Sequence, residues 1–211
     1  MEEPQLNWYA IKVFYNKVFE METALGVQGH PTFLATDKKQ LKGEEHVRAR
    51  KRIATLKLDG IEDRRYIEEG PVIYQRIPMI SSLLFVQATE DDIKVIDNDL
   101  REEKYHVKGY IYKKRNEKDG RYFCAVIPNK EMEAFRLVTR NGSEGLEFFS
   151  DKDIDCFRCG DKVRVTEGPF KGAEGYIKRI RRDRRLIVGI EGIVAIATTH
   201  IEPQFLEVIP Q

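Results

Sequence analysis

The spacing of glycines between residues 160 and 180 constrains the fold more than any other feature of the sequence. A run from Lys162 to Val165 alternates valines with basic residues, as a half-buried strand requires. Gly168 and Pro169 then turn the chain, because glycine tolerates positive φ and the proline ring holds φ at about −65°. A second strand resumes at residues 176–180. The stretch therefore predicts a short strand, a glycine-punctuated loop and a returning strand.

This segment resembles a KOW motif. Its turn residues are Gly160, Gly168, Pro169, Gly172 and Gly175. Three apolar runs follow at residues 186–191, 194–197 and 205–209. Together they resemble the five-stranded SH3-like barrel that ends NusG-type transcription elongation factors. KOW motifs also occur in ribosomal proteins, so the N-terminal half must decide between these families.

Composition predicts a globular chain with a core of its own. Of the 211 residues, 41% are hydrophobic and 34% are charged, which is unlike a disordered or membrane protein. No apolar run approaches the roughly 20 residues that a bilayer-spanning helix needs. The start of the chain lacks a basic flank followed by an apolar run, so we expect no secretory signal and a cytoplasmic location. We also expect a monomer that does not bind membranes.

Charge is nearly balanced along the chain. The formal net charge is +1, with 36 Lys and Arg against 35 Asp and Glu. Proteins that bind nucleic acid through charge alone carry a strongly basic surface. Attraction to phosphate is therefore not expected to dominate binding.

Cysteines and histidines show no catalytic or metal-binding pattern. Cys124, Cys156 and Cys159 are too few, and odd in number, for a disulfide framework. Cys156 and Cys159 have zinc-knuckle or redox spacing, but no second pair completes a tetrahedral site; reduced, inert thiols are expected, with a redox or metal role as the alternative. The histidines are scattered: His30, His46, His106 and His200. We therefore predict no cofactor, no metal and no enzymatic activity.

Hydrophobic periodicity, caps and turn residues predict alternating strands and helices before the glycine-rich segment. The expected elements are a strand at 8–14, a helix at 17–27 capped by Asn16, a strand at 32–36, a charged insertion at 37–75 with a weak helix or hairpin, a strand at 80–86, a helix from 90 to about 97 capped by Thr89, a hairpin of 105–113 with 122–127, and a helix from Pro128 to Asn141. The predicted class is α+β, with an antiparallel sheet and flanking helices followed by an all-β module.

This order resembles the NGN domain of NusG-like factors. The resemblance rests on Trp8 and Tyr9 opening a strand, on the apolar strand at 80–86 followed by an acidic helix, and on the helix entry at 126–135. It covers nearly the whole chain apart from residues 37–75. It implies three parts: an NGN-like domain at 1–142, a linker at 143–159 and a KOW domain at 160–211. Within the family the sequence is most similar to specialised paralogues that serve polysaccharide-biosynthesis operons.

The resemblance implies a surface for RNA polymerase. In NusG-like proteins the NGN domain lays an apolar concavity on the clamp helices of the polymerase, closes the clamp and suppresses pausing or termination. The positions that match are Trp8, Tyr9, Phe14, Ile80 and Leu83. The alternative is that all of them are core. Strand alternation separates positions 80 and 83 unless Ser81 and Ser82 bend the chain.

The resemblance also implies a contact with the exposed non-template DNA strand. Lys12, Tyr15, Asn16 and Lys17 match the family's contact region at the first strand-to-helix turn. A cation and an aromatic ring suit single-stranded DNA through phosphate contact and base stacking. A solvated turn is the alternative.

A basic cluster near residue 180 leaves a second functional class open. Its candidate contacts are Arg181, Arg182, Arg184 and Arg185. They could contact RNA, a ribosomal protein or an acidic polymerase surface, or be a solvated hairpin tip. The partner expected for the KOW domain as a whole is a ribosomal protein, a termination factor or nascent RNA. The basic run at 48–52 is either a solvated helix face or a nucleic-acid arm. The alternative to a transcription factor is therefore an RNA-binding or ribosome-associated KOW protein.

Overall fold

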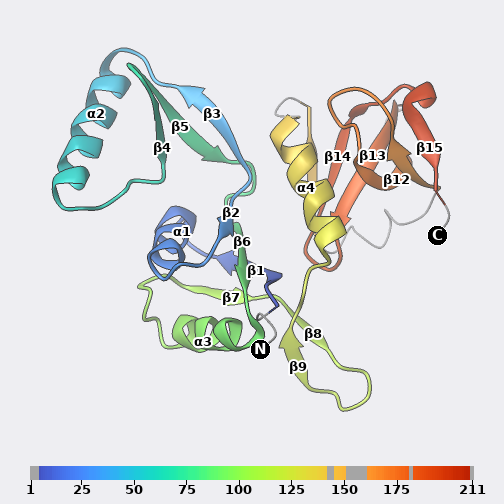
Figure 1. Ribbon diagram of the computed structural model, residues 1–211, viewed down its shortest axis with the longest axis horizontal. Helices are drawn as coiled ribbons and strands as arrows, with labels where there is room; N and C mark the ends of the chain where they lie inside the picture. The colour runs from blue at the N-terminus through green and yellow to red at the C-terminus, as the bar shows by residue number, and fades with distance from the viewer. Residues whose placement is uncertain (1–4, 142–144, 151–160, 181–182, 210–211) are drawn as a thin grey trace. The chain divides into compact units, whose positions relative to one another are not determined.

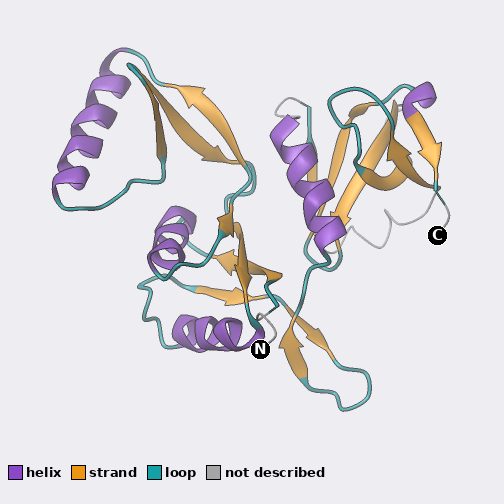
Figure 2. Ribbon diagram, in the orientation of Figure 1, coloured by secondary structure: helices purple, strands orange, loops and turns teal. Residues whose placement is uncertain are grey.

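The chain divides by its own contacts into two compact units, Met1–Ala125 and Val126–Gln211. The computed structural model describes residues 5–141, 145–150, 161–180 and 183–209. Within these residues the fold is mixed α+β, with four α-helices and several antiparallel sheets (Figures 1 and 2). The predicted fold class is confirmed at this level. None of the described helices is long and apolar enough to cross a lipid bilayer.

A four-stranded antiparallel sheet with strand order β2-β6-β1-β7 forms the centre of the N-terminal unit. Its strands are β1 (Asn7–Val13), β2 (Thr32–Phe33), β6 (Leu83–Ala88) and β7 (Gly109–Ile111), and its helices are α1 (Val18–Val27) and α3 (Glu90–Arg101). The apolar segment at 80–86 was predicted to be a central strand. β6 does lie inside the sheet, between β2 and β1.

The two faces of this sheet differ because side chains alternate along each strand. On one face Tyr9, Ile11 and Val13 join a buried cluster with residues of α1 and α3. On the other face, which we call the second face, the cross-strand pairs include Ala10 with Phe85. Burying the first face against α1 and α3 fixes the register, since a one-residue slip would exchange the faces.

The predicted cap of α3 is confirmed and that of α1 is wrong. Thr89 has an extended backbone, and its Oγ1 accepts a hydrogen bond from the Asp92 amide at 3.1 Å. α1 instead has Lys17 at its N-cap position, without a side-chain cap bond. Asn16 and Tyr15 both have positive φ, 55° and 58°. Asn16 therefore belongs to a left-handed turn before the helix and lacks the extended backbone of a cap.

The insertion folds into a layer of its own, with both a helix and a hairpin where the sequence predicted one or the other. Its elements are β3 (Thr36–Gln40), α2 (Gly43–Leu58), β4 (Tyr66–Glu69) and β5 (Val72–Pro78). The strands pair in the order β3-β5-β4. A small buried cluster joins α2 to these strands. It consists of Ala49 and Ile53 of α2 with Leu41 and Ile73, and Tyr66 packs against it. This small core explains why the charged segment is ordered.

A hairpin of β8 (Lys113–Arg115) and β9 (Tyr122–Cys124) completes the N-terminal unit and confirms the predicted turn between them. The predicted first strand at 105–113 is wrong, because β7 pairs with β1 and only Lys113 of that range pairs with β9. It extends from the end of β7 (Figure 1). The pairing of β8 with β9 is separate from the four-stranded sheet.

The C-terminal unit contains one helix and a six-stranded antiparallel sheet with the order β10-β14-β13-β12-β11-β15. Its elements are α4 (Asn129–Asn141), β10 (Glu147–Ser150), β11 (Lys162–Val165), β12 (Glu174–Ile180), β13 (Asp183–Ile190), β14 (Val194–His200), the 3₁₀ turn Pro203–Phe205 and β15 (Leu206–Val208). The strands predicted from the glycine-rich segment and the later apolar runs are all present.

The expected closed five-stranded barrel is not seen among the described residues. The sheet ends at β10 and β15, so its hydrogen bonding is open. β10 lies inside the segment 143–159 that we expected to be a linker, and it pairs with β14 from Glu147 to Ser150. Among the described residues β14 therefore pairs with β10 on one side and β13 on the other, so it does not pair with β15 to close a barrel.

α4 groups with the C-terminal unit. The sequence placed it at the end of an N-terminal module ending at residue 142, whereas the contacts divide the chain after Ala125 and pack α4 on β13. Met132, Phe135 and Val138 form its buried side. Helical periodicity located this apolar side but could not say which sheet it covers.

Candidate protein and nucleic-acid surfaces

Four aromatic side chains lie next to one another at the end of β1 and along the edge strand β7. Phe14 lies 6.3 Å from Tyr15 and 6.0 Å from Tyr110, and Tyr110 lies 5.5 Å from Tyr112, measured between ring centroids. We call Tyr15, Phe14, Tyr110 and Tyr112 the aromatic row. Phe14 and Tyr110 are exposed, and Tyr15 is 77% exposed. Such a row offers ring faces to planar ligands.

Backbone pairing builds this row. The Phe14 amide donates to the Lys108 carbonyl at 2.9 Å, which brings the residue after β1 next to β7. Lys12 lies opposite Tyr110 in the same sheet. The positive φ of Tyr15 turns the chain there and carries its ring outward.

The predicted DNA-contact residues lie together at this turn. Tyr15, Asn16 and Lys17 are exposed and Lys12 is half-buried. The Lys17 ammonium donates to the His106 carbonyl at 3.1 Å, which holds its charge near β7. Sequence reasoning missed Tyr110 as a neighbour of this group. The sequence indicated that Tyr110 lies in an alternating strand, but it did not indicate that this strand pairs with β1.

The second face of the sheet is mostly apolar, with Gln87 and Lys12 as polar members. Pairs across β1 and β6 place Trp8 opposite Gln87, Ala10 opposite Phe85 and Lys12 opposite Leu83. The Phe33 ring on β2 lies 6.3 Å from the Phe85 ring. Trp8, Phe85 and Leu83 are buried. Lys12 lies between this face and the aromatic row, since it is opposite both Leu83 and Tyr110.

The predicted polymerase-binding residues do not form one exposed surface. Trp8 and Leu83 lie on the second face, whereas Tyr9 lies in the helix-covered core, where burial raises the pKa of its hydroxyl. Phe14 belongs to the aromatic row. Ile80 is half-buried in the turn before β6, where the Leu83 amide donates to its carbonyl at 3.4 Å.

Ser81 and Ser82 do bend the chain ahead of β6. They lie in a turn, and the Ser82 carbonyl accepts from the Val13 amide at 2.8 Å. Ile80 is therefore outside the strand. Alternation along β6 does not set the side to which Ile80 points.

The described KOW-motif residues form the connection from β11 to β12. Gly168 and Gly172 have positive φ, 83° and 91°, as the turn requires. Gly175 lies within β12 at a close approach of strands, because an added Cβ would overlap the Ile187 carbonyl oxygen. The Pro169 carbonyl accepts from the Asn141 side chain at 2.7 Å. Gly160 lies outside the described residues.

Two arginines of the basic cluster, Arg184 and Arg185, lie within the described residues. Arg184 is exposed and lies opposite Arg179, so two like charges adjoin there. Arg185 instead makes an ion pair with Glu147 of β10 at 2.8 Å. Its charge is therefore partly neutralised. Arg181 and Arg182 lie outside the described residues.

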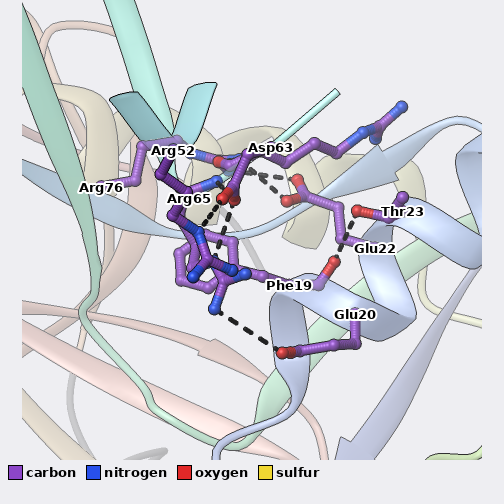
Figure 3. Close-up of polar contacts among 9 residues, drawn as sticks. Phe19, Glu20, Glu22, Thr23, Arg52, Asp63, Arg65 and Arg76 are labelled. Atoms are coloured by element: carbon purple, nitrogen blue, oxygen red, sulfur yellow. Dashed lines mark hydrogen bonds and ion pairs between the residues drawn. The ribbon is translucent and has the colours of Figure 1, made fainter. Parts of the chain in front are cut away.

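A group of charged side chains attaches the insertion to α1 (Figure 3). The Asp63 carboxylate accepts from Arg52 Nε at 2.8 Å and from Arg65 Nε at 2.9 Å. Arg65 also lies 3.8 Å from the Glu20 carboxylate on α1. Burial alone would raise the pKa of Asp63, but the hydrogen bonds from Arg65 and Arg52 outweigh it and hold the pKa below its usual value.

The basic run at 48–52 is partly neutralised by acidic neighbours. Arg48 pairs with Glu44 at 2.7 Å, and Arg52 pairs with Asp63. These pairs favour the solvated helix face over the nucleic-acid arm. Within the described residues, no group of three His, Cys, Asp or Glu side chains could hold a metal ion. Burial raises the pKa of the half-buried Cys124, which keeps its thiol protonated; Cys156 and Cys159 lie outside the described residues.

Comparison of the sequence with protein-family models gives no match, and comparison with curated proteins gives none either.

Proposed function

We propose that this chain is a NusG-like transcription elongation and antitermination factor, of the kind that serves polysaccharide-biosynthesis operons. Its N-terminal unit acts as the NGN domain and binds the clamp helices of RNA polymerase. Its C-terminal unit carries a KOW-type β module that binds a further partner, such as a ribosomal protein, a termination factor or nascent RNA. The order of the strands and helices supports this proposal, as does the glycine-rich β11–β12 loop.

The observation that carries the proposal is the apolar second face of the N-terminal sheet. Helices cover the first face, while Trp8, Phe33, Leu83 and Phe85 give the second face a large aromatic and aliphatic area. A docking site for a pair of partner helices buries about 800 Å² per partner, with a few anchors supplying most of the energy. Trp8, Leu83 and Phe85 are buried in the chain alone. We therefore place the contact at two half-buried positions, Phe33 on the edge strand β2 and Ile80 before β6.

The aromatic row supports the second half of the proposal, contact with the non-template strand. The row adjoins the second face through Lys12. A protein that binds the polymerase with this face brings Tyr15 and its neighbours close to the docking site. Bases stack on exposed rings whatever their identity, and lysines contact phosphates.

The factor acts by binding alone. A polymerase that exchanges between a paused and an elongating conformation is shifted by any ligand that prefers one of them. A preference of about 1.4 kcal/mol changes that equilibrium about tenfold. The proposed mechanism therefore requires no catalytic group.

Binding of the full chain to purified core RNA polymerase tests the proposal. Phe33→Asp places a charge on the second face, and Ile80→Asp places one in the turn before β6. Both positions are half-buried, so each variant should weaken binding at least about tenfold by burying an unpaired carboxylate. Ile77→Asp on β5 is the matched control, since it changes the same kind of residue at an exposed position of the insertion. Undiminished binding by folded Ile80→Asp and Phe33→Asp variants would contradict the proposed interface.

A further inference from the structure

The β8–β9 hairpin is fixed at its base. Lys113 Nζ lies 2.8 Å from the carboxylate of Asp97, a buried residue of α3. The Ala125 amide donates to the Tyr112 carbonyl at 2.9 Å, and Cys124 packs against the N-terminal core. The hairpin therefore projects from a defined position.

Hydrogen bonds also order the loop of the hairpin. The Asn116 amide donates to the Arg121 carbonyl, and the Gly120 amide donates to the Asn116 carbonyl, both at 2.8 Å. The Asn116 side chain accepts from the Lys118 amide at 2.9 Å, and Gly120 has a φ of 71°. These bonds close a tight turn, so little ordering entropy is lost when the hairpin binds a ligand.

Exposed aromatic rings are placed opposite basic residues on this hairpin. Tyr122 is 70% exposed and Phe123 is 49% exposed. In the register of the two strands Arg115 lies opposite Tyr122, and Lys114 lies opposite Phe123. Each of these two pairs joins a cation to a ring, the combination that binds phosphate and base together.

The hairpin as a whole is positively charged. Residues 113–124 carry five basic and two acidic side chains, a net charge of +3, against +1 for the whole chain. The basic residues are Lys113, Lys114, Arg115, Lys118 and Arg121. Only the base of this basic, aromatic hairpin packs on the core. The rest suits an anionic ligand that carries planar aromatic rings.

One side of the hairpin continues the aromatic row. Tyr110, Tyr112 and Lys114 occupy alternate positions along β7 and β8, and Phe123 lies opposite Lys114. Phe123 is therefore on the side of the row. Tyr122 lies on the opposite side of the ribbon.

We propose that a single-stranded nucleic acid runs along the aromatic row and onto the Phe123 side of the hairpin. The hairpin is then a second contact on the same nucleic acid. The path of the nucleic acid from the β1–α1 turn to the hairpin rests on the DNA contact proposed above for that turn. Bases stack on the rings of Tyr15, Tyr110 and Phe123, and the basic side chains contact the phosphates. Duplex DNA, whose bases are already stacked, binds more weakly.

Fluorescence anisotropy of labelled oligonucleotides with the purified full chain tests this site. The probes are a single-stranded DNA, an RNA of the same sequence and the corresponding DNA duplex; comparing the first two shows whether the 2′-hydroxyl contributes. Phe123→Ala should weaken single-strand binding between about fivefold and 150-fold, the loss expected for one base–ring stack. Tyr122→Ala is the matched control and should change binding less than about twofold. Lys114→Gln should lower the slope of log K against log salt by about 0.7.

A variant of the turn separates this inference from the proposed function. If Tyr15→Ala weakens binding and Phe123→Ala does not, the hairpin site is overturned and the turn contact stands. If Phe123→Ala weakens binding and Tyr15→Ala does not, the hairpin binds by itself and the proposed turn contact fails. Equal losses for Tyr122→Ala and Phe123→Ala would overturn the assigned side. Unchanged binding in every variant, with far-UV circular dichroism confirming folded protein, would overturn both contacts.

Discussion

The guanidinium of Arg76 on β5 donates two hydrogen bonds to the carboxylate of Glu22 on α1, at 2.8 and 3.1 Å (Figure 3). The two side chains are only 16% and 6% exposed. Arg76 also donates to the Arg64 carbonyl at 2.8 Å and lies 5.3 Å from the centre of the Phe19 ring. The insertion is thus attached to α1 through a buried, bidentate ion pair.

Replacing Arg76 by methionine should destabilise the N-terminal unit by about 3 to 5 kcal/mol, because it leaves the Glu22 carboxylate buried without a partner. Urea unfolding followed by circular dichroism measures the change. Lys38→Met is the control: it breaks the Lys38–Glu69 pair, whose side chains are half exposed, and should cost at most about 1 kcal/mol. Equal losses for the two variants would show that the buried pair does not hold the insertion.

Acid should weaken the neighbouring ion pairs of Asp63 with Arg52 and Arg65. The pKa of Asp63 is lowered in the folded protein, so its ionised form contributes stability above the ordinary aspartate pKa of about 3.9. That contribution is lost as the pH falls through the folded pKa. The stability difference between wild type and Asp63→Asn should therefore be constant from pH 7 to about pH 5 and shrink below pH 4. A difference that stays unchanged in acid would contradict the assigned role of Asp63.

Gly175→Ala should be more damaging than Gly168→Ala. An added Cβ at Gly175 would overlap the Ile187 carbonyl oxygen of the neighbouring strand, and backbone can relieve that overlap only by moving. At Gly168 nothing lies within 4 Å, so alanine there has only the cost of positive φ, about 1 to 2 kcal/mol. Thermal unfolding of the two variants makes the comparison. Similar stabilities would mean that β12 and β13 can separate at Gly175 without cost.

Thr89→Ala should cost about 1 kcal/mol, since it removes the side-chain acceptor for the Asp92 amide at the start of α3. Thr55 offers a control within α2, where its hydroxyl donates to the Lys51 carbonyl on an exposed face. Thr55→Ala should be neutral or slightly stabilising, because alanine has the higher helix propensity. Chemical denaturation of both variants checks the sign. Greater stability in Thr89→Ala would show that the Thr89 side chain does not stabilise α3.

Local chemistry in the sequence was a good guide to local structure. The Thr89 cap, the β8–β9 turn and the β11–β12 loop each depend on residues close together in the chain, and all were predicted. Asn16 shows the limit of such reasoning, since an asparagine before a helix favours both a cap and a left-handed turn.

Features that depend on distant pairing could not be predicted. β10 lies in a segment without clear alternation and is ordered by pairing with β14, some fifty residues away (Glu147 with Ala197). The aromatic row needs Phe14 beside Tyr110, which only the β1–β7 register provides. The insertion's core likewise joins Leu41 to Ile73 across a charged stretch.

Single-round transcription by purified core RNA polymerase, on a template with a defined pause, measures the proposed activity itself. The full chain should shorten the lifetime of the pause, and Ile80→Asp should do so much less than Ile77→Asp. An unchanged pause lifetime at the highest soluble concentration of folded protein would mean that the chain is not an elongation factor for this polymerase.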